Sequence, residues 1–216
     1  MSSDWKKTFK EYAEALLIAL ILAFFIRSFV VQAFKIPSGS MLETLQIGDH
    51  LLVNKFLYGV KLPFVNKTVI PVSEPEIQDI IVFKYPEDPS KDFIKRVIGT
   101  PGDTIEIRDK QVWRNGKKLT EPYARHTSNH INDNGFPMQQ WPPHSYAPVL
   151  RDNLGRIQVP EDKYFVMGDN RDESYDSRFW GYVDEKDVVG KAWRIYWSWK
   201  GLTEIRWTRI GDYVGE

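Results

Sequence analysis

The first pattern in the chain is a run of apolar residues that extends without interruption from position 15 to position 26 and resumes at positions 29–31. Taken over residues 12–31, it covers twenty positions, which at about 1.5 Å per helical residue matches a bilayer core roughly 30 Å thick. Three lysines precede the run, so the positive-inside rule places the N-terminus in the cytoplasm. The pattern predicts a cytoplasmic segment over residues 1–11 and a transmembrane signal-anchor helix over residues 12–34.

A cleaved signal peptide is the competing interpretation of this segment. It is favoured by the basic start, the short apolar region and a small-residue motif that ends at Ala33. Arg27 is compatible with an anchor, because a long side chain near the end of a span reaches the headgroups. Candidate chemistry begins within seven residues of Ala33, at Ser40, which favours an anchor that is retained.

After residue 34 the pattern changes to short alternating or apolar runs, rich in β-branched and aromatic residues and separated by Gly, Pro, Asn and Asp. Asn115 and Gly116 stand between two such runs, which is typical of a tight β-hairpin. No long helical periodicity follows the anchor, so residues 35–216 are predicted to form a mostly β, antiparallel domain. The expected strands cover residues 50–56, 79–84, 93–98, 104–108, 164–167, 188–197 and 202–210.

Residues 121–160 differ from the rest of this domain. They are rich in Pro, Asn, His and Gly and show no sustained period, so we expect a loop-rich, irregular insertion. Its histidines, His126, His130 and His144, have no carboxylate or thiol at ligand spacing. They are interpreted as solvated loop side chains, and no metal site is predicted.

Composition narrows the functional classes. Hydrophobic residues make up 42% of the 216 positions and charged residues 27%, which indicates a folded chain. The 29 basic and 29 acidic residues balance, so there is no basic excess that would suggest a nucleic-acid partner. The absence of cysteine excludes disulfides, thiolate nucleophiles and iron–sulfur clusters.

The first candidate motif follows the apolar segment and reads Ile-Pro-Ser-Gly-Ser-Met over residues 36–41. Gly39 permits a close backbone approach, and Pro37 stiffens the chain before it. The hydroxyls of Ser38 and Ser40 flank the glycine, so one could act as a nucleophile while the other binds an oxyanion. By itself, a polar turn that leaves the membrane is the simpler interpretation.

The second motif reads Phe-Ile-Lys-Arg-Val-Ile-Gly over residues 93–99. On a strand, Lys95 shares one face with Phe93 and Val97, while Arg96 points to the other face. A desolvated lysine loses its proton, whereas an arginine cannot be deprotonated in a protein, so Lys95 is the candidate general base. An ordinary surface strand with an extended lysine remains the alternative for this motif alone.

The third motif is a dense polar run that follows Met167 and ends in Phe-Trp-Gly over residues 179–181. Its spacing does not fit a calcium loop, because Arg171, Ser174 and Trp180 occupy positions that require a ligand, a glycine and a glutamate. The run predicts a structured turn held by hydrogen bonds between side chains and backbone.

In their order, their spacing and their residue identities, the three motifs resemble those of bacterial type I signal peptidase (leader peptidase), a membrane-bound endopeptidase with a Ser–Lys dyad. The resemblance extends over almost the whole chain and includes an Ile-Gly-Asp stretch at residues 47–49. Two positions depart from the family pattern: Glu43 stands where the family commonly has proline, and Glu173 where it commonly has asparagine. Neither is the nucleophile or the base, so the departures bear on local geometry and substrate fit.

The resemblance implies that Ser40 is the nucleophile and Lys95 its general base, a dyad that needs neither metal nor cofactor. It also implies an oxyanion hole formed by the Ser40 backbone N–H and the Ser38 hydroxyl. Five further residues are expected to orient the amine, brace the site or hold the turn: Ser174, Asp176, Arg178, Asp169 and Asn170.

The family cleaves exported preproteins after small residues, at the outer surface of the cell membrane. Secreted preproteins and the lipid bilayer are therefore the expected partners, with the secretion translocon as a further candidate. Apolar residues around the motifs are expected to wall shallow pockets that exclude large side chains: Phe34, Ile36, Met41, Phe93 and Ile94. Four tryptophans would either dock the domain on lipid headgroups or pack in its core: Trp193, Trp197, Trp199 and Trp207.

Two other classes of function stay open. A Ser–Lys protease with a more specialised substrate would keep the dyad, although no DNA-binding helical module of the self-cleaving repressor kind precedes the β domain. A membrane-anchored, β-rich binding or scaffold module would leave the coexistence of the three motifs unexplained. A Ser-His-Asp hydrolase is disfavoured because no histidine lies in any motif.

Overall fold

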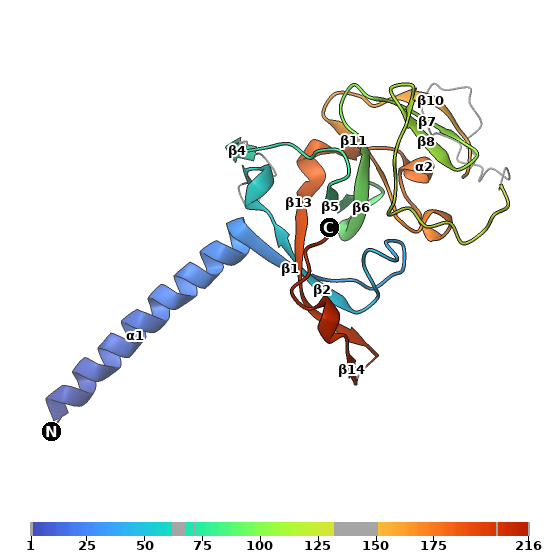
Figure 1. Cartoon of the computed structure of the whole chain (residues 1–216). Helices are drawn as coiled ribbons and strands as arrows, with labels where there is room; N and C mark the ends of the chain where they lie inside the picture. The colour runs from blue at the N-terminus through green and yellow to red at the C-terminus, as the bar shows by residue number, and fades with distance from the viewer. Residues whose placement is uncertain (1, 62–67, 71, 132–150, 202, 216) are drawn as a thin grey trace.

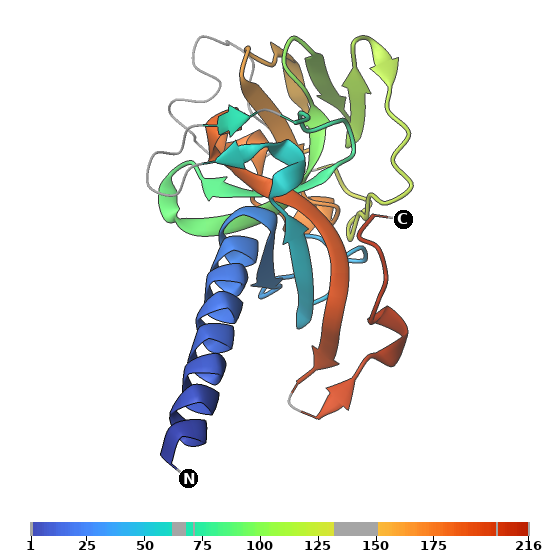
Figure 2. The same cartoon turned by 90° about the vertical axis from the view of Figure 1, so that its left-hand side faces the viewer.

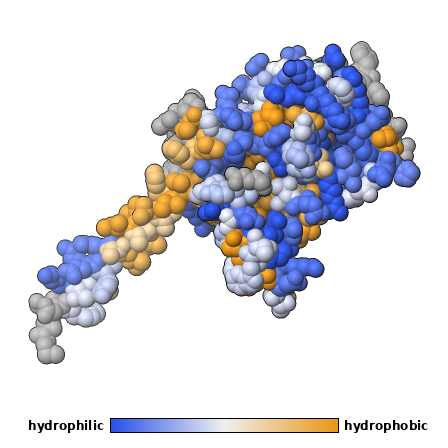
Figure 3. All heavy atoms as spheres, viewed as in Figure 1, coloured by the Kyte–Doolittle hydropathy of each residue, from blue (hydrophilic) through white to orange (hydrophobic). Residues whose placement is uncertain are grey.

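A computed structural model of the chain describes residues 2–61, 68–70, 72–131, 151–201 and 203–215. Helix α1 (Ser2–Phe25) stands away from a β domain, to which a π-helical turn (Ile26–Val30) joins it (Figure 1). The apolar side chains of α1 are not packed against the domain: Leu16, Ile18 and Ile21 each expose 60% or more of their surface. Figure 3 shows a hydrophobic band on the part of the helix nearest the domain.

The transmembrane helix expected over residues 12–34 is wrong in its extent. The last residues of that range form the strand β1 (Val31–Lys35), which pairs with β2 (Asp49–Asn54) and so cannot continue the helix. At the other end of the apolar run, Lys10 and Glu14 place charge within α1. Among the described residues, no helix is both long enough and apolar enough to cross a membrane.

The β domain is mostly antiparallel, as predicted. Its main sheet adds six strands to β1 and β2: β5 (Ile80–Tyr85), β6 (Asp88–Gly99), β11 (Lys163–Met167), β12 (Val183–Asp184), β13 (Val188–Lys200) and β14 (Glu204–Ile205). The order is β1-β2-β13-β5-β6-β11-β12, with β14 paired to the far end of β13. The strand β6 therefore lies inside the sheet, and β13 carries β14 toward the side from which α1 extends (Figure 2).

A second sheet has the order β10-β7-β8-β9 and comprises β7 (Thr104–Arg108), β8 (Gln111–Arg114), β9 (Lys117–Lys118) and β10 (Leu154–Gln158). Asn115 and Gly116 join β8 to β9 with φ angles of 52° and 76°, which confirms the predicted tight hairpin. The strand β10 lies within residues 121–160, where we expected irregular structure. Its burial depends on pairing with β7, which a local pattern does not reveal.

The remaining elements are short. The strands β3 (Val60–Lys61) and β4 (Thr68–Ile70) form a separate pair, and helix α2 (Ser177–Trp180) follows the polar turn after β11. Single turns of 3₁₀ helix lie at Phe56–Tyr58, Arg171–Glu173, Glu185–Asp187 and Trp207–Arg209. Within residues 121–131 the described chain has no helix or strand, except an isolated bridge between Arg125 and Asn170.

Candidate active site

Ser40 lies in the loop that joins β1 to β2. Backbone hydrogen bonds close the base of this loop, from the Ile36 N–H to the Asp49 carbonyl at 2.8 Å and from the Gly48 N–H to the Ile36 carbonyl at 2.9 Å. The side chains of Met41 and Leu45 are fully buried in a core cluster beneath the loop. The loop is thus held by its apolar residues, while Ser40 itself stays partly accessible.

Lys95 reaches Ser40 from the internal strand β6. Its Nζ donates to the Ser40 Oγ at 2.9 Å and to the Ile94 carbonyl at 3.0 Å, and it lies 5.4 Å from the centre of the Phe93 ring. Only 4% of Lys95 is exposed, and no described carboxylate is within salt-bridge distance of its amine. The structure therefore brings together the two residues predicted to form the dyad.

The environment of Lys95 favours the neutral amine. Burial lowers the pKa of Lys95 to about 8, while the charges of Asp176 and Asp169 oppose this shift and that of Arg178 adds to it. About half of the amine is then neutral at pH 8. A neutral amine at hydrogen-bond distance can accept the proton of the Ser40 hydroxyl.

The polar turn after β11 holds the Ser40 loop in place. The backbone N–H of Asn170 donates to the Ser40 carbonyl at 3.1 Å, and its side-chain Nδ2 donates to the Gly39 carbonyl at 3.0 Å. The neighbouring Asp169 is fully buried and accepts from Arg96 through Nε at 2.8 Å and Nη2 at 2.7 Å. The turn is thus tied both to the loop of Ser40 and to the strand of Lys95.

Asp176 and Arg178 brace the same turn from within. The Asp176 carboxylate accepts from the Gly168 N–H at 3.0 Å and from Nε and Nη2 of Arg178, each at 2.9 Å. Burial acts to raise the pKa of Asp176, but the charge and hydrogen bonds of Arg178 outweigh it, so this pKa lies below its ordinary value. Arg178 also donates to the Arg171 carbonyl at 2.6 Å and so closes the turn.

Ser174 is buried at the site but does not make the expected hydrogen bond to Lys95. Its hydroxyl is close enough to Asp176 to help lower the pKa of that carboxyl, yet it makes no hydrogen bond of standard geometry among the described residues. The Lys95 amine bonds to Ser40 and Ile94 instead. A role for Ser174 in orienting the amine therefore stays a prediction.

The two donors expected for an oxyanion hole are both unused in this structure. Ser38 is exposed, and among the described residues no group accepts a hydrogen bond from its hydroxyl or from the Ser40 N–H. Both groups therefore remain open to an oxygen atom of a bound substrate. Their joint action on an oxyanion stays a prediction.

The five expected pocket residues divide into two groups. Ile36 and Met41 are buried in the core cluster under the loop, so packing accounts for them. Phe34 lies on β1, just before the Ser40 loop, and Phe93 and Ile94 lie on β6 next to Lys95. All three are half-buried and keep part of their surface accessible. These three are the stronger candidates for substrate contact.

Gly168 is a functional position that sequence reasoning missed. A Cβ at this residue would lie 2.2 Å from the Ser174 Oγ and 2.5 Å from the Ser40 carbonyl oxygen, so only glycine allows the turn to approach the nucleophile. A glycine directly after a buried strand, ahead of a polar run, is the signal that could have identified it. The partner of Arg96 was missed because it lies 73 positions away in the chain.

A second buried carboxylate fastens the far end of the Ser40 loop. Asp49 accepts from Arg209 Nη2 at 2.6 Å and from Ser198 Oγ at 2.6 Å, and Arg209 also donates to the Thr44 carbonyl at 2.9 Å. Glu43, the departure from the family pattern, forms an exposed ion pair with Arg125. Through Arg125, Glu43 thus contacts the segment that forms a bridge with Asn170 of the polar turn.

A hollow of about 830 Å³ lies behind the Ser40 loop. Thr44, Arg96, Tyr123 and Arg209 line it, but Ser40 and Lys95 do not. Among the described residues, no group of three or more histidine, aspartate or glutamate side chains could hold a metal ion. His126 and His130 are exposed in their loop, and His144 lies outside the described residues.

Comparison with known proteins gives consistent matches. The family model described as signal peptidase, peptidase S26, matches residues 9–197. The signal peptidase I of Pseudomonas aeruginosa is 36% identical over an alignment of 208 positions, gaps included, which covers 88% of this chain and 72% of that protein. The signal peptidase I of Buchnera aphidicola subsp. Schizaphis graminum is 34% identical over an alignment of 258 positions, gaps included, which covers 96% of this chain and 82% of that protein. A crystal structure of a signal peptidase I from Enterococcus faecalis matches 55% of this chain and 97% of that chain, with 32% identity and a TM-score of 0.41.

Proposed function

Because the chain belongs to the signal peptidase family, peptidase S26, we propose that it is a membrane-bound serine endopeptidase that removes signal peptides from exported preproteins. The observation that carries this proposal is the 2.9 Å contact between the Lys95 amine and the Ser40 hydroxyl. Burial supports it, because the amine is removed from water and its pKa is lowered to about 8.

In the proposed reaction, the neutral Lys95 amine takes the proton of Ser40 as the Oγ attacks the scissile carbonyl carbon. The Ser40 N–H and the Ser38 hydroxyl stabilise the oxyanion of the tetrahedral intermediate. The Lys95 ammonium then gives its proton to the leaving amine, which leaves an acyl-enzyme on Ser40. Lys95 next takes a proton from water as the water oxygen attacks the ester carbon. The Lys95 ammonium then returns this proton to the departing Ser40 Oγ, which releases the signal peptide as a carboxylic acid and restores both the serine and the neutral amine.

The substrate is proposed to be an extended segment with small residues before the cut. The strand β1 leads directly into the Ser40 loop and is at the edge of the main sheet, so its outer side could pair with an extended peptide. Phe34 lies on this strand, and Ile94 and Phe93 adjoin Lys95. Their partly accessible side chains would leave room for alanine but not for a large residue.

The same family implies a cell-membrane location, with the N-terminus in the cytoplasm and the β domain outside. In support, α1 exposes large apolar side chains to its surroundings and stands clear of the domain (Figure 3). Embedding this helix would remove the exposed apolar surface from water. We propose that α1 holds the active site near the lipid surface, where the site encounters preproteins and the secretion translocon.

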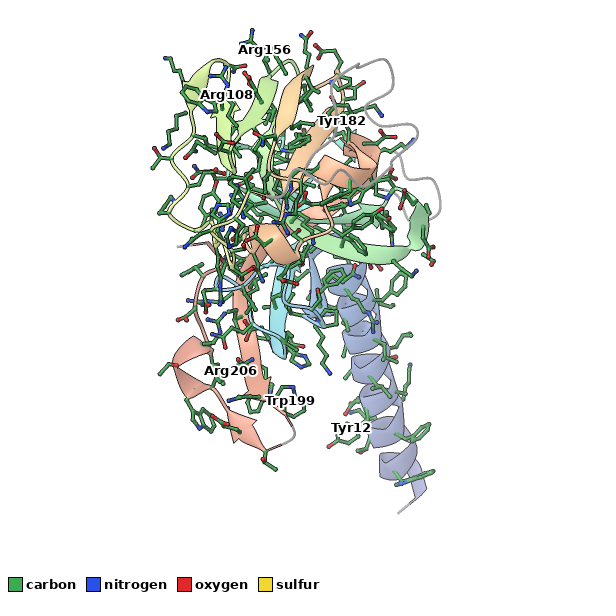
Figure 4. The ribbon with its side chains drawn as sticks, turned by 90° about the vertical axis from the view of Figure 1, so that its right-hand side faces the viewer. Tyr12, Arg108, Arg156, Tyr182, Trp199 and Arg206 are labelled. Carbon is green, nitrogen blue, oxygen red and sulfur yellow. The ribbon has the colours of Figure 1, made fainter. Side chains whose placement is uncertain are left out.

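The end of the β13–β14 hairpin is proposed to rest on lipid headgroups beside this anchor. Trp207 is 69% exposed, and Trp197 contacts Trp199 and Trp207 edge-on. Trp193 is 42% exposed but lies in the middle of β13, away from this end. Trp199 and Arg206 lie together near this end (Figure 4). Aromatic rings beside a cation are typical of the interface of a bilayer.

Location can be tested with single cysteines, because the native chain has none. Ser3→Cys and Lys117→Cys would each be treated with a membrane-impermeant maleimide in spheroplasts. The expected result is labelling of Lys117→Cys in intact spheroplasts and of Ser3→Cys only after lysis. Equal labelling of both before lysis would contradict the orientation.

Activity is tested by mixing the purified full chain, in detergent, with a preprotein that carries an Ala-x-Ala site. Wild type should release the mature N-terminus, read by mass spectrometry, whereas Ser40→Ala should not. A preprotein with phenylalanine before the cut is the matched substrate control and should resist cleavage. Cleavage by Ser40→Ala at the wild-type rate would disprove the proposed nucleophile.

A further inference from the structure

Thr44 makes a contact for which neither the dyad nor the oxyanion hole accounts. Its Oγ1 donates to the Asp169 Oδ2 at 2.5 Å, across 125 positions of the chain. Thr44 is half-buried and Asp169 is fully buried, so the contact is shielded from water. A hydrogen bond to a buried carboxylate is among the stronger ones in proteins.

The same carboxylate binds the strand of the base. Asp169 accepts from Arg96 at 2.8 Å and 2.7 Å, and Arg96 directly follows Lys95 on β6. Thr44 stands four residues after Ser40 in the loop. Asp169 therefore connects the two segments that carry the nucleophile and the base.

We propose that Thr44 is a positioning residue of the peptidase reaction, which holds the Ser40 loop against β6 through Asp169. The inference rests on the proposed Ser40–Lys95 dyad. Thr44 touches neither the substrate nor the reacting atoms in this scheme. It acts by keeping the Ser40 Oγ within reach of the Lys95 amine.

The contact also bears on the charge near the amine. Asp169 favours the charged form of Lys95, as does Asp176, while Arg178 opposes it, and Asp169 faces Arg96 and Tyr123 on its other sides. Without the Thr44 hydroxyl, the Asp169 charge is less compensated and the pKa of Lys95 rises. The pH at which activity appears should then move upward, a change that simple loss of folded protein would not cause.

Three variants test the role of Thr44: Thr44→Val keeps the shape without the hydroxyl, Thr44→Ser keeps the hydroxyl, and Thr120→Val makes the same change at an exposed threonine. For Thr44→Val we expect kcat to fall at least about tenfold, KM to change less than about twofold, and the rise of activity to shift to higher pH. Thr44→Ser and Thr120→Val should retain at least about half of wild-type kcat.

The inference would be overturned if Thr44→Val had the same kcat and the same pH profile as the wild type. The inference would also be overturned if Thr44→Val and Thr44→Ser lost kcat to the same extent and neither shifted the pH profile of activity. That result would indicate that Thr44 contributes through packing only. Wild type and Ser40→Ala are run in parallel with a covalent serine probe. If wild type neither cleaves nor reacts with the probe, the proposed function fails; if it does both and Thr44→Val behaves like it, only the role of Thr44 fails.

Discussion

The two faces of β6 place neighbouring cations in opposite environments. On one face, Lys95 is buried with no described carboxylate within salt-bridge distance, and its pKa falls to about 8. On the other face, Arg96 is equally buried but is paired through two nitrogens with Asp169, and it stacks 3.8 Å from the centre of the Tyr123 ring. The strand thus separates an amine whose pKa is lowered by burial from a buried ion pair.

The difference shows how an uncharged lysine can exist close to acidic residues. Asp169 and Asp176 both favour the charged Lys95, but each is paired with an arginine, Arg96 and Arg178 respectively. Pairing compensates the carboxylate charge, so the burial of the amine prevails. The buried ion pairs are therefore part of what sets the chemistry, besides holding the turn.

Removal of either dyad member should have the largest effect. Ser40→Ala and Lys95→Ala should lower kcat at least about 1,000-fold, since the nucleophile or its base is lost. Lys95→Arg is the matched control on this face, and it should not rescue activity because a guanidinium stays charged. Cleavage assays with the preprotein check this; turnover by Lys95→Arg above a tenth of wild type would contradict the assignment of the base.

Opening the ion pair on the other face should destabilise the fold. Arg96→Ala or Asp169→Asn leaves a buried partner without its counter-charge, which we expect to cost about 3–5 kcal/mol of unfolding free energy. Urea unfolding measured by tryptophan fluorescence checks it, with Arg96→Lys as the charge-preserving control. A loss below about 1 kcal/mol for both variants would show that the pair is dispensable.

Loss of the Ser38 hydroxyl should affect the transition state but not the dyad. Ser38→Ala is expected to lower kcat about 100- to 1,000-fold, the usual effect of removing one oxyanion donor. Ser38→Thr retains a hydroxyl and should recover part of the rate. Because Ser38 is exposed, unfolding free energy should hardly change. A rate within threefold of wild type for Ser38→Ala would exclude this donor.

The pH dependence should reflect the protonation of the Lys95 amine. Below the pKa of about 8 the amine is protonated and cannot accept the serine proton, so kcat should fall about tenfold per pH unit and level off above it. Arg96→Lys should keep the same midpoint in the fraction that is folded. A rate that is flat from pH 6 to pH 9 is incompatible with an amine base.

The exposed pair of Glu43 and Arg125 should give the smallest effect. Their side chains are 68% and 42% exposed, so Glu43→Gln should change unfolding free energy by less than about 1 kcal/mol. High salt should remove even that difference, because it screens exposed charges. A salt-independent loss above about 2 kcal/mol would mean that this position has acquired a larger structural role.

The two residues proposed to carry the chemistry could be singled out from sequence, because each lies in a local motif that resembles the family pattern. The structure brings Ser40 and Lys95 into contact at 2.9 Å, while their roles stay a proposal. The hairpin at Asn115 is another local feature, and the structure confirms it. Contacts such as Thr44 with Asp169 could not be predicted, since the partners are distant in the chain and meet only through the sheet. The third motif predicts a turn, but it does not indicate which backbone groups the turn binds.

The end of α1 shows the same limit in the fold. Residues 31–34 are mainly apolar, so they fit equally well into a helix or into an alternating strand. The choice is decided by pairing with β2, whose own register depends on β13 on its other side. Neither pairing can be predicted from the local sequence.

The most direct measurement is a titration of the Lys95 amine itself. The protein would be produced with lysine labelled with ¹³C at Cε, and the Lys95 signal assigned by its absence from Lys95→Arg. Observed by NMR in detergent, that signal should titrate with a midpoint near pH 8, while exposed lysines titrate near 10.4. A Lys95 midpoint at or above 10 would contradict the account, because the amine would then be almost fully protonated at pH 8 and could not accept the serine proton.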